Sequence, residues 1–249
     1  METFPLWLPT AFFFIALFYS MVGFGGGSSY LAVLALAGLP YRSIPTVSLF
    51  CNLIVTIGGC WNFYRGGHFE AKAVLPFVIF SIPMAYLGGR MTIGKEVFSI
   101  LLGISLLVAA LRMFLPEHSF ERSKEISWAT AWRIGLPTGG LLGFLAGLVG
   151  IGGGIFLSPF LLFLKWVNVK EASAAASFFI MVNSLSGLLG QAQKGTVQTY
   201  LLLPLGISVL LGGQIGSRLG AYRLSKVSLN RILGALILYA SVKLIWIGL

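Results

Sequence analysis

Two similar glycine-rich stretches, Val22-Gly-Phe-Gly-Gly-Gly-Ser28 and Val149-Gly-Ile-Gly-Gly-Gly-Ile155, lie 127 residues apart when counted from Gly23 to Gly150. Each stretch follows an apolar segment and precedes a second, shorter apolar segment. Glycine adopts φ > 0 freely and is unfavourable inside a helix by roughly 1 kcal/mol relative to alanine. The two stretches therefore predict the same break in helical structure at two places in the chain.

The sequence around the two stretches is repeated as well. Further matches occur at offsets of 127 to 131 residues: Pro9-Thr10 with Pro137-Thr138, Ser48-Leu-Phe50 with Ser177-Phe-Phe179, Gly58 with Gly187, Arg65 with Lys194, Leu75-Pro76 with Leu203-Pro204, Gly88-Gly-Arg90 with Gly216-Ser-Arg218, Gly103 with Gly234, and Arg112 with Lys243. Self-similarity of this kind indicates two copies of one structural unit. We expect a first repeat over residues 1–115, a polar linker over 116–130 and a second repeat over 131–249.

The composition indicates an all-α membrane protein. Of the 249 residues, 57% are hydrophobic and 10% charged, and the mean hydropathy is +0.92. Soluble domains carry about 25% charged residues, and the apolar runs here lack the alternation of a membrane β-barrel. Glu2 stands where a signal peptide would be basic, so we expect the first segment to remain in the membrane.

Each repeat is expected to contain five helical segments. They are a leading helix (7–22 and 134–149), a short helix after the break (28–38 and 155–165) and three spanning helices (44–64, 71–89 and 96–114, then 173–192, 198–217 and 228–247). Glycines at a spacing of four, over 135–147 and 212–220, are expected to pack helix against helix.

The 17 Lys and Arg residues predict how the segments cross the membrane. If a leading helix and its short helix together cross once, these cations divide almost evenly between the two sides. If they form a re-entrant hairpin, 12 fall on one side and 5 on the other, as the positive-inside rule requires. Each half then crosses an odd number of times, so the second is inverted relative to the first, as in many secondary transporters. We expect both termini outside the cell and the 116–130 linker in the cytoplasm of an inner-membrane protein.

The breaks are candidate binding sites for an anion. A helix that begins inside the membrane presents unpaired N–H groups and the positive end of its dipole. The candidate residues are Gly25, Gly26, Gly27 and Ser28 in the first break, and Gly152, Gly153 and Gly154 in the second. The alternative is that these glycines only permit a tight hairpin or a close helix crossing.

Four amide side chains inside the predicted spans are further candidates for the substrate site, namely Asn52, Asn62, Asn183 and Gln191. Polar groups in a span are often functional, but they also form hydrogen bonds between helices, and both interpretations stay open. The chain contains no Asp, and its seven Glu fall at predicted helix ends or in loops. A cation pathway, a metal site, a cofactor and catalytic residues are therefore not expected. The scattered basic residues do not predict nucleic-acid binding, and the expected partners are the lipid bilayer and a small anionic substrate.

The two glycine-rich stretches, together with Leu157-Ser-Pro159 after the second, resemble the TauE/SafE sulfite exporter family. Ala172–Ser177 and the residues before Ser48-Leu49 are similar to a further segment of that family. The resemblance implies a secondary transporter or permease for a small sulfur-containing anion, such as sulfite or an organosulfonate. The alternative function is a channel or permease for a different small solute, with the breaks acting only as hinges.

Overall fold

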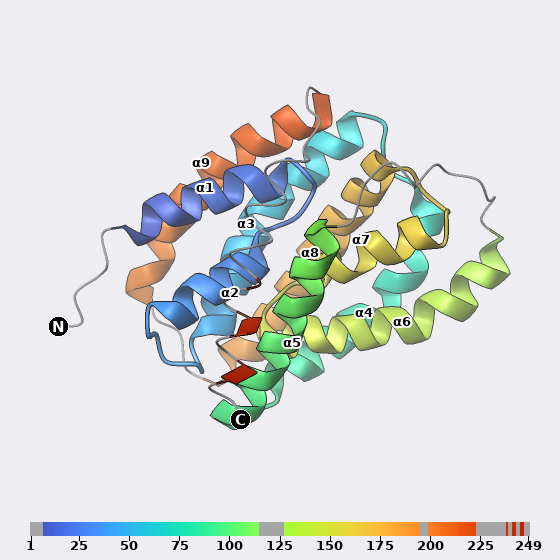
Figure 1. Ribbon diagram of the computed structural model, residues 1–249. Helices are drawn as coiled ribbons and strands as arrows, with labels where there is room; N and C mark the ends of the chain where they lie inside the picture. The colour runs from blue at the N-terminus through green and yellow to red at the C-terminus, as the bar shows by residue number, and fades with distance from the viewer. Residues whose placement is uncertain are drawn as a thin grey trace.

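The computed structural model describes residues 7–114, 127–194 and 199–222, together with 238, 241–242 and 245–246. Every regular element in these residues is helical (Figure 1). The helices are α1 (Leu8–Ser20), α2 (Gly27–Leu36), α3 (Ile44–Arg65), α4 (Ala71–Arg90), α5 (Lys95–Phe114), α6 (Trp128–Val149), α7 (Gly154–Phe163), α8 (Val169–Ala192) and α9 (Thr199–Tyr222). In this part of the chain α3, α4, α6, α8 and α9 are long and apolar enough to cross a membrane. The expected all-helical membrane fold is confirmed.

Two helices begin earlier than the sequence pattern predicts. α6 starts at Trp128, inside the predicted linker, because its first residues favour a helix and the Trp128 and Trp132 rings stack one turn apart. α8 starts at Val169, because the Asn168 side chain accepts hydrogen bonds from the N–H groups of Lys170 and Glu171. The predicted helix over 228–247 lies outside the described residues, apart from 238, 241–242 and 245–246, which are helical.

The long helices pack in pairs that join the two halves of the sequence. α3 and α8 run antiparallel through the centre, since Gly59 lies beside Ser177 while Leu49 lies beside Gly187. α6 runs parallel to α4, and α9 runs parallel to α1. The predicted glycine stripes form both parallel contacts: Gly139, Gly143 and Gly147 lie against Phe77, Ser81 and Ala85, and Gly212, Gly216 and Gly220 lie against Phe13, Leu17 and Met21. A Cβ at most of these positions would meet backbone atoms of the partner helix, so their packing role is confirmed.

Each short helix turns back along the helix before it. The rings of Phe12 in α1 and Tyr30 in α2 stack with their centroids 4.5 Å apart. Figure 1 shows the hairpin of α1 and α2 on the left and that of α6 and α7 on the right. The two breaks therefore approach each other in the middle of the molecule, beside the crossing of α3 and α8.

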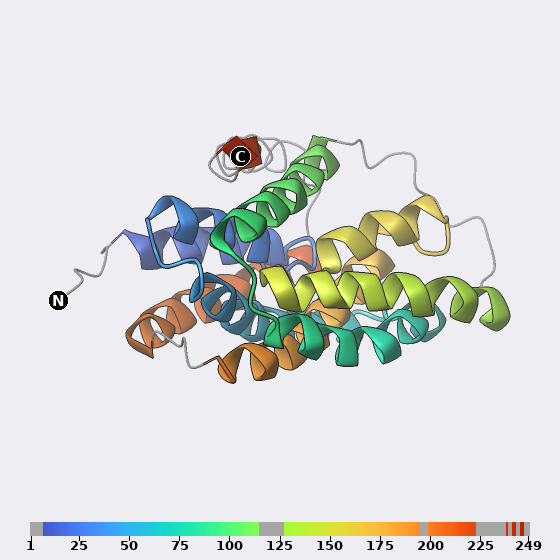
Figure 2. The ribbon, with the colours of Figure 1, turned by 90° about the horizontal axis from the view of Figure 1, so that it is seen from below.

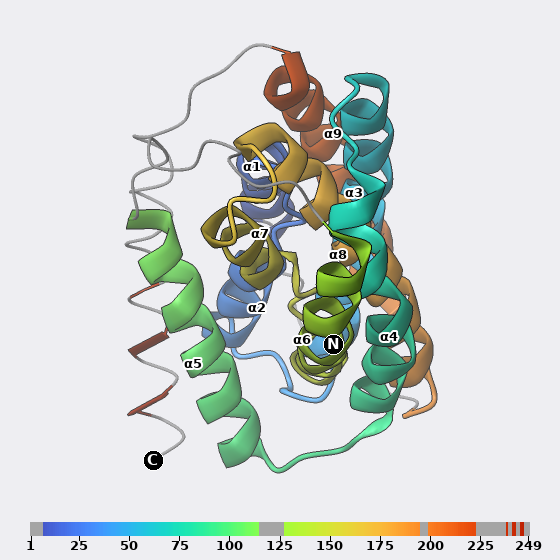
Figure 3. The same ribbon diagram turned by 90° about the vertical axis from the view of Figure 1, so that its right-hand side faces the viewer.

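α5 lies along one flank of the molecule (Figures 2 and 3). The hydroxyl of Ser241 donates to the carbonyl oxygen of Gly103 at 2.8 Å, and Ile245 lies over the same glycine. Gly103 thus allows the described part of the C-terminal segment to pack closely on α5.

Candidate functional site between the two breaks

The two breaks share a left-handed backbone conformation at two pairs of matching positions, although Gly152 has a φ of +83° and its counterpart Gly25 has no positive φ. Gly23 and Gly150 follow α1 and α6 with φ of +76° and +89°. Gly26 and Gly153 are the N-caps of α2 and α7, with φ of +96° and +79°. A residue with a Cβ is strained in this left-handed region. The predicted breaks are therefore present in both halves, and these four positions favour glycine for local reasons alone.

Both short helices begin in the interior with N–H groups that have no partner within the helix. The first backbone hydrogen bond of α2 joins the N–H of Tyr30 to the carbonyl oxygen of Gly26, at 3.0 Å. In α7 the first N–H groups to donate are those of Phe156 and Leu157, which reach the carbonyl oxygen of Gly153 at 3.1 and 3.3 Å. The N–H groups before these residues and the helix dipole give each end a partial positive charge. Each helix has 10 residues, which span about 15 Å or half of a bilayer core.

Asn52 of α3 lies where the two breaks meet. Its side chain is completely buried, and Nδ2 donates to the carbonyl oxygen of Ile151 at 3.4 Å. A Cβ on Gly152 would lie 3.0 Å from Nδ2, and one on Gly25 would collide with Oδ1. A Cβ on Gly27 would lie 2.7 Å from the Ile151 oxygen, so glycine is required for this approach. Oδ1 of Asn52 has no hydrogen-bond partner among the described residues.

Each break is bonded to a serine from the opposite half of the chain. Ser48 of α3 donates to the carbonyl oxygen of Gly150 at 2.8 Å, and Ser177 of α8 donates to that of Gly23 at 2.7 Å. The donors match each other in the repeat, and so do the acceptors. These serines were not predicted as site residues. Their offset of 129 residues, which matches them in the repeat, is the sequence signal that could have identified them.

The hydroxyl of Ser28 is bonded to α1, in its own half of the chain. It donates to the phenol oxygen of Tyr19 at 3.2 Å, and the Ser29 hydroxyl does so at 2.8 Å. Both serines are buried. Ser28 can therefore offer its backbone N–H to a ligand more readily than its hydroxyl.

The other three candidate amides lie along the helix contacts. Asn62 donates to Ser217 at 2.8 Å, Gln191 donates to the carbonyl of Gly147 at 2.9 Å, and Asn183 donates to Phe179 in its own helix at 2.9 Å. The structure does not bring these three together with the breaks. Ser184, which was not predicted, lies closer: a Cβ on Gly152 would be 3.4 Å from its hydroxyl, which has no partner among the described residues.

The charges around this site are those of helix ends, not of side chains. Glu70, Glu96 and Glu171 all lie at the start of helices, away from the breaks. No cluster of His, Cys, Asp and Glu that could hold a metal ion occurs in the described residues. A partial positive charge from two helix N-termini, without a neighbouring carboxylate, suits an anion.

Comparison with known proteins identifies the family of the chain. The family model of the sulfite exporter TauE/SafE matches residues 8–244. The chain belongs to this family. Among similar proteins, the probable membrane transporter protein y4hK of Sinorhizobium fredii is 33% identical, over 99% of this chain and 100% of its own length. The probable membrane transporter protein MJ0441 of Methanocaldococcus jannaschii is 26% identical, over 91% of each chain.

No solved structure matches this TauE/SafE chain. Its family and its relatives are membrane transporters, and so is this multi-pass protein, which is not an enzyme. It lies in a lipid bilayer and handles a small solute.

Proposed function

We propose that this TauE/SafE transporter carries a small sulfur-containing oxyanion, of the sulfite or organosulfonate class, across the inner membrane. The substrate is held near the midplane by the N–H groups of the two breaks, from Gly25 to Ser28 and from Gly152 to Gly154, and by Asn52. The observation that carries the proposal is the convergence of two helix N-termini, one from each half, on the buried Asn52 side chain.

The electrostatics of the breaks favour an anion over a cation. Sodium or proton relays inside membranes are usually built on carboxylates, whereas N–H groups at helix starts bind anions. Asn52 adds an amide nitrogen with two N–H protons, of which one is bonded to the Ile151 carbonyl and the other can donate to an oxyanion. Neutral N–H donors bind an anion less tightly than a fixed positive charge would, so the substrate can also be released.

The pairing of the halves supports an inverted repeat with a shared site. The repeat mates α3 and α8 run antiparallel, and the contact of α1 with α9 has its counterpart in that of α6 with α4. Asn52 fills the space between the breaks, so binding requires this side chain to move or the halves to shift. We propose alternating access between the repeats 1–115 and 131–249, with both termini outside and the 116–130 linker in the cytoplasm.

One observation favours the second candidate function, a channel or permease for a different small solute. A Cβ on Gly150 would lie 2.6 Å from the Cα of Pro45, and one on Gly23 would meet Ser173 at 2.7 Å or less. Such contacts require glycine whether or not a ligand binds. Transport measurements separate the two functions, whereas glycine substitutions do not.

The proposal is tested by flux into proteoliposomes that contain the purified protein. We expect saturable uptake of radiolabelled sulfite, sulfoacetate or thiosulfate, inhibited by the unlabelled anion and absent from protein-free vesicles. Chloride and a neutral amino acid are the control solutes. Equal flux of the controls, or no flux of any of the three sulfur anions, would contradict the proposed substrate class.

A further inference from the structure

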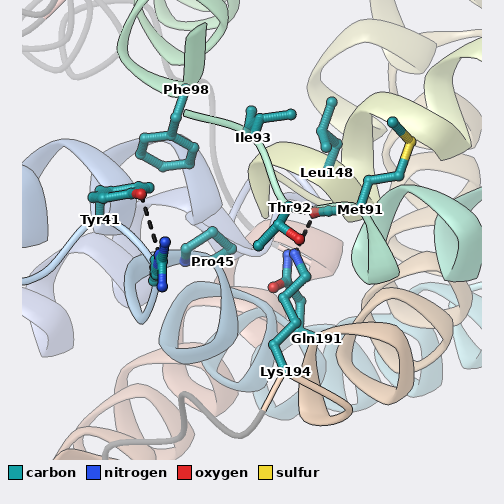
Figure 4. A pocket seen from close by; sticks show the side chains of 10 residues that line it. Tyr41, Pro45, Met91, Thr92, Ile93, Phe98, Leu148, Gln191 and Lys194 are labelled. Carbon is teal, nitrogen blue, oxygen red and sulfur yellow. Dashed lines mark hydrogen bonds between the residues drawn. The ribbon is translucent and has the colours of Figure 1, made fainter. Parts of the chain in front are cut away.

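A small pocket lies beside the second break, at the end of the molecule where α4 and α8 finish (Figure 4). Its volume is about 70 Å³, and it is lined by Tyr41, Arg42, Pro45, Met91, Thr92, Ile93, Phe98, Leu148, Gln191 and Lys194. That is room for a few water molecules or one small oxyanion, but not for a nucleotide. The pocket therefore suits a small ligand.

Lys194 brings a second positive charge into this pocket, in addition to that of Arg42. Its ammonium group donates one hydrogen bond, to the carbonyl oxygen of Met91, which ties the end of α8 to the chain after α4 (Figure 4). An ammonium has three protons to donate, and no carboxylate is paired with Lys194 among the described residues. Partial burial lowers the pKa of Lys194, because it removes water from the charged form. A partly desolvated cation with one neutral partner is stabilised by an anion.

The floor of the pocket is polar and leads toward the second break. Gln191, one turn before Lys194, is 1% exposed, and its Oε1 has no partner among the described residues. Its Nε2 is bonded to Gly147, three residues before Gly150. Pro45, in the wall of the pocket, packs directly on Gly150. Two residues that line the pocket, Pro45 and Gln191, therefore also contact the second break or the helix that leads into it.

The corresponding position in the other half is arranged differently. Arg65 matches Lys194 in the repeat, and Asn62 matches Gln191 at the same offset of 129. Arg65 lies over the Trp61 ring, with its guanidinium carbon 5.1 Å from the centroid, and Asn62 is bonded to Ser217. The two ends are thus not equivalent in this conformation, because the charge of Arg65 is held by an aromatic ring and that of Lys194 by a single carbonyl oxygen.

We infer that this pocket is a second anion site, a vestibule in which Lys194 holds a small oxyanion on its way to or from the breaks. The anion takes the two ammonium protons that the Met91 bond leaves, and the Thr92 hydroxyl in the pocket wall can supply a further donor. The position of the vestibule on a transport path rests on the proposed function. Its ligand class follows from the charge and the volume alone.

The experiment measures the charge preference of the pocket without requiring transport. Thr92→Cys is introduced into full-length protein in which Cys51 and Cys60, the two native cysteines, are replaced by alanine. Its modification rate is measured with two thiosulfonate reagents, one bearing a sulfonate and one a trimethylammonium. We expect Lys194→Gln to lower the sulfonate-to-ammonium rate ratio about tenfold, because one positive charge attracts one reagent and repels the other. Lys194→Arg keeps the ratio.

Protection by an anion and a matched control complete the test. Sulfate should slow the modification of the Thr92→Cys protein while Lys194 is present and have no effect after Lys194→Gln. Lys95→Gln removes an exposed cation near the same end, outside the pocket, and should leave both readouts unchanged. An unchanged ratio and sulfate protection after Lys194→Gln would overturn the vestibule and leave Lys194 as a structural tie. If the ratio falls but no sulfur oxyanion is transported, the proposed function fails and the anion site stands.

Discussion

Asn52 lies between the two breaks, so a substitution there tests both halves of the proposed site at once. Asn52→Asp keeps the size of the side chain and adds one negative charge between the breaks. At about 5 Å from an anion and an effective dielectric of about 20, that charge costs roughly 3 kcal/mol, or on the order of a hundredfold in affinity. We expect flux of sulfite or a sulfonate to fall accordingly in proteoliposomes.

Asn62→Asp is the matched control, because Asn62 is also a buried amide on α3 but is bonded to Ser217, away from the breaks. Both variants bury one new carboxylate, so both can lower stability, which size-exclusion chromatography in detergent would report. Transport that falls equally in both folded variants would argue against a site at Asn52.

Lys194 makes the affinity for an anion depend on pH. Its lowered pKa means that it loses its charge at a lower pH than an ordinary lysine, whose value is 10.5. The charged groups on the surrounding elements are Arg42, Arg90, Lys95 and Glu96. With a sulfonate that stays ionised, we expect the KM of the wild type to rise at a pH below that at which an ordinary lysine loses its charge, as Lys194 becomes neutral.

Lys194→Arg is the control for this effect, since a guanidinium keeps its charge over the same range. Its KM should stay level while that of the wild type rises. Parallel pH profiles in both proteins would mean that another group is titrating.

Part of this site was predictable from residue order, and part was not. The breaks were visible because three successive glycines inside an apolar run strongly disfavour a continuous helix. Asn62, Asn183 and Gln191 could not be separated from Asn52 by the same reasoning, because an amide in a span bonds to whatever the helix packing places beside it. The hydrogen bonds of Ser48 and Ser177 to the breaks could not be predicted from sequence, since their acceptors lie 102 and 154 residues away along the chain.

At the scale of the helices, close packing depends on glycine at particular depths. A Cβ on Gly216 of α9 would collide with the backbone of Leu17 in α1. We expect Gly216→Ala to destabilise the protein by about 1–3 kcal/mol, the usual cost of overpacking. Thermal unfolding of the purified protein should show a lower Tm.

Gly206→Ala on the same helix is the comparison, because its Cβ would meet only side chains, the nearest being the Phe50 ring at 3.1 Å. Alanine also favours the helix by roughly 1 kcal/mol, so Tm should stay level or rise. A similar loss of stability in both variants would show that helix propensity or insertion, and not contact with α1, sets the effect.

The boundaries of the helices were less predictable than their existence. The apolar runs identified the nine described helices, but the start of α8 depends on the cap formed by Asn168, which belongs to no apolar pattern. α6 extends into residues assigned to the linker, because alanine and tryptophan continue a helix without adding to its periodicity. Local hydrogen bonds and ring stacking, and not hydropathy, set both of these ends.

At the scale of the whole molecule, the inverted arrangement predicts which side of the membrane each loop reaches. In intact cells, with Cys51 and Cys60 replaced by alanine, a membrane-impermeant thiol reagent should label Arg42→Cys and Lys95→Cys. It should label Lys72→Cys and Lys170→Cys only after the cells are opened. Labelling of all four from outside, or the reverse pattern, would contradict the topology based on the positive-inside rule.

The exchange of partners between the halves has a consequence for how the protein is made. Among the described residues, the break of the first half receives its hydrogen bond from Ser177 of α8, and α1 packs against the glycine-lined face of α9. A nascent chain that has inserted only the first half therefore leaves the carbonyl of Gly23 without the donor it has in the finished protein. The first half therefore reaches its final contacts only after α8 and α9 have been made, and a ribosome that stops early leaves these contacts unformed and does not yield half a transporter.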